Sequence, residues 1–282
     1  GQTTPGVPFG FNLPGGISGT ITFTGPGDAY FDITTRKVIL LNTSLESTLL
    51  VQANGTLTDF DIVTNDDASM GSITVTAPLA GDSDIVVDAY CLAISVGDFS
   101  GTGSIRVGMN LRSLITGNFT GGFIQAAFWV RDIVINGNFG VPGVTGEARI
   151  DANASNSITI NGTFAGLVNI ERDLASFRVN GAMTQAQFRA GNSVGTFTTG
   201  AMSQSRVSTG DHIGPIVING NVTESNIQAG GDLGSDVAPG GTGFAADRAS
   251  SGSITSVQVN GNFTRSSVAA GFLRGNDGYF GT

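Results

Sequence analysis

One short pattern recurs along the chain, and its clearest copy reads Ile216-Val217-Ile218-Asn219-Gly220-Asn221-Val222. Close copies begin at Ile133, Ile158 and Val257. In each copy apolar residues occupy alternate positions, which is the side-chain period of a β-strand. The Asn-Gly pair then interrupts the run, because both residues favour turns. The pattern therefore predicts a short strand that ends at a corner.

The glycine of this pattern marks a repeat of about 20 residues. It recurs at Gly97, Gly117, Gly137, Gly162, Gly181, Gly200, Gly220 and Gly261, so the successive spacings are 20, 20, 25, 19, 19, 20 and 41 residues. A fixed period of this size is typical of a solenoid. Other apolar positions before and after the glycine predict two or three short strands per turn. Gly, Asn or Asp should adopt positive φ at the corners.

These features predict an all-β fold, a parallel β-helix whose rungs of about 20 residues stack roughly 4.8 Å apart. We expect a right-handed coil. Each apolar side chain should stack on its copy in the next rung. The asparagines that precede the repeat glycine should form a hydrogen-bonded ladder along the axis, and they are Asn136, Asn161, Asn180, Asn219 and Asn260.

The chain divides into three parts. Residues 1–16 are rich in Gly and Pro and predict an arm or linker. Residues 17–44 alternate in polarity and predict antiparallel strands that cap the solenoid. Residues 45–282 should form the β-helix, with less regular rungs up to about residue 90. Within it, residues 230–252 form a Gly-rich insertion that should protrude as a loop.

Composition excludes several other classes of protein. Of 282 residues only 12% are charged and 43 are Gly, and no Gly-X-Y repeat is present, so helical bundles, coiled coils and collagen are not expected. The net charge is −9 and the cations do not cluster, which argues against nucleic-acid binding. No apolar run reaches the ~20 residues of a membrane-spanning helix. The single cysteine, Cys91, lies in an apolar stretch and should pack as a small hydrophobic residue.

Two longer units point to a family. Residues 220–230 and 261–271 share the pattern Gly-Asn-Phe/Val-Thr-x-Ser-x-Ile/Val-x-Ala-Gly, and the second is followed by Asn-Asp-Gly-Tyr-Phe-Gly-Thr at 276–282. The pattern resembles the Gly-rich β-solenoid repeats of very large secreted bacterial surface proteins of the planctomycete type. The resemblance covers roughly residues 45–282, although the insertion lacks a clean Asp-Gly-x-Phe. It implies an exported, extracellular or cell-surface structural protein.

An enzyme on this fold would be a polysaccharide lyase or hydrolase, and the sequence offers little for either. The arginines Arg112, Arg131, Arg149, Arg172, Arg189 and Arg206 shift in phase against the repeat and should not converge. The one histidine, His212, lies beside Asp211, with no Ser or Cys evidently placed to partner it. The pairs Asp59/Asp61, Asp66/Asp67 and Asp82/Asp84 are explained by turns and solvated strand faces. Trp129 is at most a sugar contact. We therefore expect no catalytic residues.

Calcium is the more plausible site chemistry, because hard cations bind oxygens on flexible, Gly-rich loops. The candidate ligands are Asp232, Asp236 and Asp247 in the insertion, and Asn276 and Asp277 near residue 282. Neither group has the EF-hand spacing or the Gly-Gly-x-Gly-x-Asp repeat. Ordinary turn residues are the alternative reading, and no other cofactor is expected.

The sequence as a whole predicts a structural, self-associating protein of a bacterial cell surface, such as a component of a surface layer, fibre or appendage. Its partners would be other copies of itself or other surface proteins. A calcium-dependent adhesin or glycan-binding module is the alternative, and a polysaccharide-degrading enzyme comes third.

Overall fold

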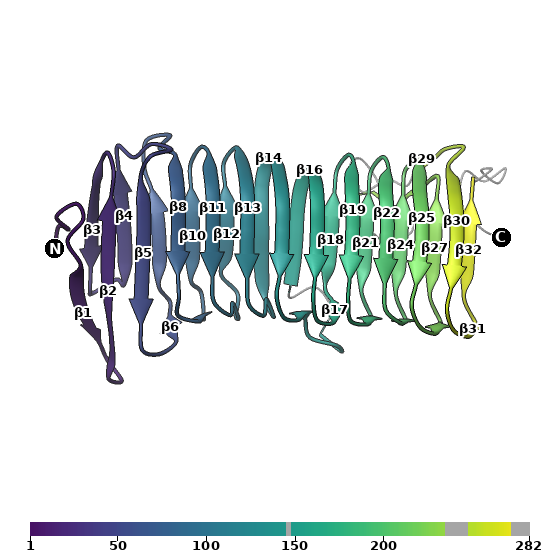
Figure 1. Cartoon of the computed structure of the whole chain (residues 1–282), viewed down its shortest axis with the longest axis horizontal. Helices are drawn as coiled ribbons and strands as arrows, with labels where there is room; N and C mark the ends of the chain where they lie inside the picture. Colours follow the sequence, from purple (N-terminus) through teal and green to yellow (C-terminus); the bar gives the residue numbers. More distant parts are fainter. Residues whose placement is uncertain (145–147, 235–247, 272–282) are drawn as a thin grey trace. The chain divides into compact units, whose positions relative to one another are not determined.

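The computed structural model describes residues 1–144, 148–234 and 248–271. Over these residues the chain consists of β-strands and the turns between them, with no helix and so no helix able to cross a membrane. It divides into an N-terminal unit, Gly1–Gly137, and a C-terminal unit, Asn138–Thr282. Within each unit most strands lie parallel to their neighbours from the rungs before and after, which confirms the all-β solenoid (Figure 1).

The N-terminal unit contains three rows of parallel strands. The first row consists of β5 (Thr48–Ala53), β8 (Met70–Val75), β11 (Cys91–Val96), β13 (Asn110–Thr116) and the second half of β14 (Gly122–Ile135). The second row consists of β4 (Lys37–Leu41), β7 (Asp61–Thr64), β10 (Asp84–Val87), β12 (Ser104–Val107) and the first half of β14. The short third row consists of β6 (Leu57–Thr58), β9 (Leu79–Ala80) and single bridges at Phe99 and Phe119.

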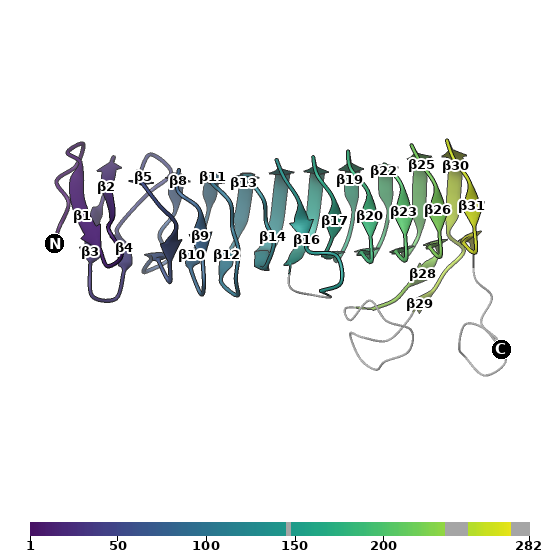
Figure 2. The same ribbon diagram turned by 90° about the horizontal axis from the view of Figure 1, so that it is seen from below.

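Antiparallel strands close the N-terminal end of this unit (Figure 2). β1 (Phe9–Leu13) pairs with β2 (Ile17–Thr24), β2 pairs with β5, and β3 (Asp28–Asp32) pairs with β4. Residues 1–16, expected as an arm or linker, thus contribute a strand to the cap. The rings of Phe11, Phe31 and Phe60 meet at centroid distances of 5.3–6.1 Å. They shield the end of the core, which a terminal rung would otherwise expose to water.

The C-terminal unit repeats the three-row arrangement. Its first row consists of the second half of β16 (Ala148–Ile160), β19 (Leu174–Val179), β22 (Val194–Thr199), β25 (His212–Ile218) and β30 (Ser253–Val259). Its second row consists of the first half of β16, β18 (Leu167–Ile170), β21 (Gln187–Ala190), β24 (Arg206–Thr209), β27 (Asn226–Ala229) and β32 (Ser267–Ala270). Its third row consists of β15 (Phe139–Gly140), β17 (Phe164–Ala165), β20 (Met183–Thr184), β23 (Met202–Ser203), β26 (Val222–Thr223) and β31 (Phe263–Thr264).

The predicted stacking of like side chains is confirmed inside the C-terminal unit. Phe177 and Phe197 occupy the same position in β19 and β22, are both fully buried, and have ring centroids 5.3 Å apart. The asparagine ladder is confirmed at two steps. The Asn180 amide donates to the Asn161 side-chain oxygen at 2.7 Å, and Asn260 donates to Asn219 at 3.1 Å. Each rung therefore adds apolar burial and hydrogen bonds to the one before it.

The prediction that Gly, Asn or Asp adopt positive φ at corners is confirmed at residues such as Gly81, Asn42 and Asp59, but the repeat glycines do not share this conformation. None of them is among the residues with positive φ, which include Gly81, Gly101 and Asp59 at other corners. At Gly181 and Gly200, close approach to the backbone of the preceding rung leaves no room for a side chain. A Cβ on Gly181 would lie 2.4 Å from the backbone oxygen of the preceding rung, and a Cβ on Gly200 would lie 2.3 Å from the oxygen of Gly181. A side chain at this position would force neighbouring rungs apart.

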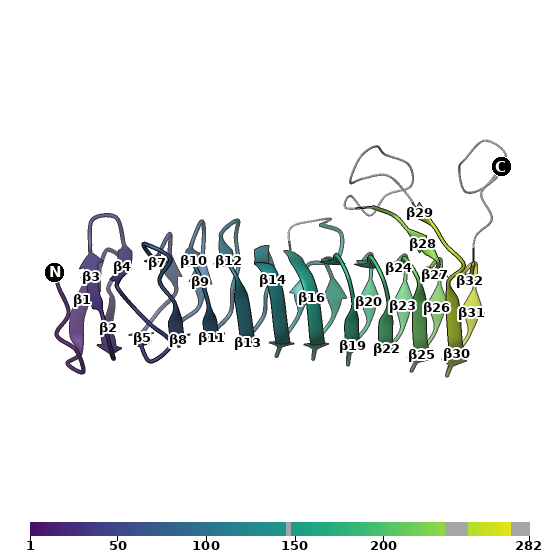
Figure 3. The ribbon, with the colours of Figure 1, turned by 90° about the horizontal axis from the view of Figure 1, so that it is seen from above.

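The base of the insertion lies against the solenoid. β28 (Gly231–Asp232) pairs antiparallel with β29 (Arg248–Ala249), and β28 lies beside β24 (Figure 3). Leu233 is buried and packs with Leu167. The described part of the insertion thus packs beside the second row. The predicted protruding loop falls on residues 235–247, which lie outside the described residues, so it stays a prediction.

Candidate functional site

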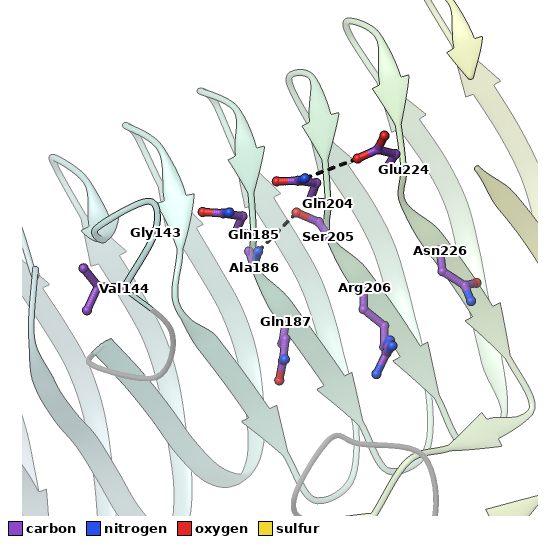
Figure 4. Close-up of a pocket in the computed structure, with 10 residues that line it drawn as sticks. All are labelled: Gly143, Val144, Gln185, Ala186, Gln187, Gln204, Ser205, Arg206, Glu224 and Asn226. Atoms are coloured by element: carbon purple, nitrogen blue, oxygen red, sulfur yellow. Dashed lines mark hydrogen bonds between the residues drawn. The ribbon is translucent and has the colours of Figure 1, made fainter. Parts of the chain in front are cut away.

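A groove of about 500 Å³ lies on the C-terminal unit where the third row turns into the second (Figure 4). One wall is the segment that contains Gly143 and Val144. The rest is formed by three successive rungs, each of which contributes the corner residue and the first residue of the following second-row strand. These residues are Gln185 and Gln187, Gln204 and Arg206, and Glu224 and Asn226, with Ala186 and Ser205 between them.

The corner residues have an unusual backbone conformation. Gln185, Gln204 and Glu224 adopt φ values of 52°, 49° and 49°, in the left-handed region. This region costs a residue with a side chain roughly 1–2 kcal/mol, whereas Gly adopts it freely. The equivalent corners of the N-terminal unit include Asp59, Gly81 and Gly101, with φ values of 51°, 68° and 104°. Both units therefore carry polar side chains at a corner where Gly is the unstrained choice.

The second set of groove residues occupies the same position on three successive strands of the second row. Gln187 pairs with Arg206, and Arg206 with Asn226, across β21, β24 and β27. All three side chains are half-buried. Within the described part of the chain, they make no side-chain hydrogen bond or ion pair, and neither does Gln185 at the corner. The groove thus presents amide and guanidinium groups whose hydrogen-bonding capacity is not used by the described residues.

The remaining polar groups of the corner are paired. Gln204 Nε2 donates to Glu224 Oε2 at 3.2 Å, and Glu224 also pairs with Arg265 at 2.5 Å. Ser205 is buried, donates to the Ser203 oxygen at 2.8 Å and accepts the Ala186 N–H at 3.2 Å. Satisfied hydroxyls of this kind fix the floor of the groove. The unpaired side chains therefore project from a rigid surface.

A second polar cluster lies where the base of the insertion meets the second row. Two of the arginines meet in this cluster, so the expectation that the arginines do not converge is wrong for these two. Arg149 pairs with Asp151, whose Oδ1 also accepts from Asn169 at 3.0 Å. Arg189 donates to the Asn169 side chain at 2.7 Å and to Glu171 at 3.1 Å. Two arginines from different rungs thus share one network, because the register aligns Asp151, Asn169 and Arg189 on successive strands.

Arg189 anchors the insertion through Asp232. Arg189 Nε and Nη2 donate to the two carboxylate oxygens of Asp232 at 2.5 and 2.9 Å, and both side chains are almost fully buried. Burial lowers the pKa of the guanidinium, but the hydrogen bond and charge of Asp232, with a further contribution from Glu171, raise that pKa above its ordinary value. The pair is a bidentate, charge-assisted clasp.

This clasp bears on the predicted calcium ligands. Both Asp232 oxygens already accept hydrogen bonds from Arg189, and Oδ1 also accepts the Gly234 N–H at 3.1 Å. Asp236, Asp247, Asn276 and Asp277 lie outside the described residues. Among residues 1–144, 148–234 and 248–271, no three His, Cys, Asp or Glu side chains gather as metal ligands would. Calcium binding stays a prediction.

His212 has partners that the sequence reading missed. Its Nδ1 lies 2.8 Å from Ser253 Oγ, and its Nε2 lies 3.2 Å from Thr255 Oγ1. Both hydroxyls come from β30, which pairs with β25 although the insertion separates the two strands in sequence. A Ser-His-acid triad needs a carboxylate on the second ring nitrogen. Here hydroxyls contact both nitrogens, so the arrangement is that of a surface hydrogen-bond network.

The aspartate pairs of the N-terminal unit serve the backbone. Asp59 Oδ1 accepts the Asp82 N–H at 3.0 Å, and Asp61 Oδ1 accepts the Asp84 N–H at 3.2 Å. Burial raises the pKa of Asp61, with a smaller contribution from the charge of Asp84. Each carboxylate therefore caps the next rung, which supports the reading of these pairs as turn and strand-end residues.

Two single residues complete the comparison with the sequence. Cys91 is buried in β11, and burial raises the pKa of its thiol to about 12. This confirms that it packs as a hydrophobic residue. Trp129 lies in β14 and is 37% exposed, beside Phe128, which is 56% exposed. An exposed ring of this kind leaves the weak sugar-contact prediction for Trp129 open.

Comparison of the chain with protein-family models, with curated proteins and with solved structures finds no match.

Proposed function

We propose that this chain is a structural, self-associating β-solenoid protein of a bacterial cell surface. The observation that carries the proposal is that three rows of strands run from rung to rung through each unit, in register and over a continuous apolar core. In such repeat structures stability accumulates from neighbour to neighbour. The rows therefore provide stiffness by adding equivalent, mutually bonded layers.

The self-associating part of the proposal is supported by the resemblance to secreted bacterial repeats, which implies a structural protein of the cell surface. We infer that copies of this chain associate with one another, as components of a surface layer, fibre or appendage do.

The surface location is supported by chemistry and by resemblance. Only 12% of the residues are charged, and much of the chain is Gly, as in the secreted planctomycete-type repeats that the sequence resembles. We propose a non-catalytic role, since His212 contacts hydroxyls of Ser253 and Thr255 at its two ring nitrogens and, among the described residues, no orienting acid.

Sedimentation velocity over a range of protein concentrations tests the self-association. We expect the wild type to form higher species as concentration rises, and a wild type that stays monomeric would contradict self-association.

A further inference from the structure

We propose that the groove of the C-terminal unit binds a neutral, extended oligosaccharide laid along the solenoid axis. The first argument is unused hydrogen-bonding capacity. Gln185, Gln187, Arg206 and Asn226 carry planar amide or guanidinium groups that make no side-chain hydrogen bond within the described part of the chain. Each amide offers both donors and an acceptor, and the guanidinium offers several donors in a fixed plane. Adjacent sugar hydroxyls, which donate and accept, are complementary to such groups.

Charge narrows the ligand class. The lining contains one cation, Arg206, and one anion, Glu224, and Glu224 is paired with Arg265 outside the lining. A polyanion such as a nucleic acid requires several uncompensated cations. Balanced charge with a majority of amides and hydroxyls instead suits an uncharged, polyhydroxylated ligand.

Geometry favours an extended polymer over a compact ligand. The same two positions line the groove on three successive rungs, and parallel strands lie roughly 4.8 Å apart. Successive sugar units of a linear glycan follow one another at a comparable interval along its length. A peptide fits less well, because extended peptides are recognised by free strand edges. The groove strands β21 and β24 are paired on both sides, so their backbone groups are already used.

The corner conformation places polar side chains along the edge of the groove. Gln185, Gln204 and Glu224 all adopt left-handed φ, as Asp59 does at the equivalent corner of the N-terminal unit. The conformation is therefore a feature of the repeat, and in the C-terminal unit it holds these three side chains along the groove (Figure 4). The inference does not depend on self-association, since the groove lies within one unit of one chain.

Isothermal titration calorimetry with a panel of neutral hexasaccharides tests the proposal. Suitable probes are the linear hexamers of β-linked glucose, N-acetylglucosamine and mannose, with oligogalacturonate as the charged comparison and an unstructured polar peptide as the other class. We expect at least one neutral hexamer to bind and the charged oligomer and peptide not to bind. Failure of every neutral hexamer, or preference for the charged oligomer or the peptide, would overturn the proposal.

Variants locate the binding. Arg206→Ala and Asn226→Ala should each weaken the binding of that hexamer at least about tenfold, equivalent to ~1.4 kcal/mol. Arg172→Ala removes the same charge from an exposed residue that does not line the groove, and it should bind as the wild type does. Gln185→Gly should raise Tm, because it relieves the strained corner, while it weakens binding. Unchanged affinity in all three groove variants would place the ligand elsewhere and overturn the site.

Discussion

Substitution of Gly200 by Ala tests how closely the rungs approach each other. The added Cβ would lie 2.3 Å from the backbone oxygen of Gly181 and 2.9 Å from its carbonyl carbon. The obstacle is backbone, and it is held in place, since Gly200 N donates to the Gly181 oxygen at 3.0 Å and Gly181 N donates to Gly162 at 3.2 Å. Relief of the clash requires these rungs to separate locally.

The expected cost follows from that separation. Overpacking of a tight site costs about 1–3 kcal/mol, and each weakened backbone hydrogen bond adds about 0.5–1.5 kcal/mol. Ala also restricts the backbone of the unfolded chain, which stabilises the folded state relative to it and offsets roughly 0.4–1 kcal/mol of this cost. We therefore expect Gly200→Ala to lower the free energy of unfolding by about 1–3 kcal/mol.

Denaturant unfolding followed by far-UV circular dichroism measures this difference. Gly10→Ala is the matched control, because a Cβ there meets nothing within 4 Å and the φ of Gly10 is not positive. It should be neutral or slightly stabilising. If Gly200→Ala were as stable as the wild type, the close approach of the rungs would not be the reason for the repeat glycine.

Three further predictions concern burial and ionisation. Phe197→Ala should lower the free energy of unfolding by about 3–5 kcal/mol, because Phe197 is fully buried. Phe263→Ala should lower it by only about 1 kcal/mol, because that ring is 46% exposed. Equal losses in denaturant unfolding would contradict the described core. Cys91, whose burial raises its thiol pKa to about 12, should react with iodoacetamide only after denaturation, and mass spectrometry showing rapid labelling of the folded chain would refute this burial. The pKa of Asp61 is raised by burial, so the folded state holds that proton more tightly. The contribution of Asp61 to stability should be present below pH about 4, near the ordinary pKa of Asp, and should be lost as the pH rises through its raised folded pKa. Asp61→Asn should flatten this part of the urea-unfolding profile, and parallel profiles would show that Asp61 does not titrate as described.

The sequence was sufficient to predict the strand rows, and the reason is physical. Alternation in stretches such as residues 216–222 specifies strands, and a period of 19–20 residues specifies which residues stack. The ladder between Asn180 and Asn161 followed from the same period. The role of Gly200 could not be predicted in this way. The backbone of the neighbouring rung leaves no room for a side chain at Gly200, whereas rules based on local sequence consider only the φ angle of the glycine.

The groove was missed although a signal was present. Gln185, Gln204 and Glu224 are spaced by 19 and 20 residues, so polar side chains at one fixed position of the repeat could have been noticed. Their left-handed φ was not foreseeable, because Gln and Glu are not typical of that conformation. The contact of His212 with Ser253 spans 41 residues, two periods across the insertion, and register alone could have revealed it.

Electron microscopy of the purified chain at native salt tests the central claim most directly. We expect ordered assemblies that contain many copies of the chain. Fields of dispersed single particles for the wild type across the accessible concentration range would contradict a structural, self-associating role.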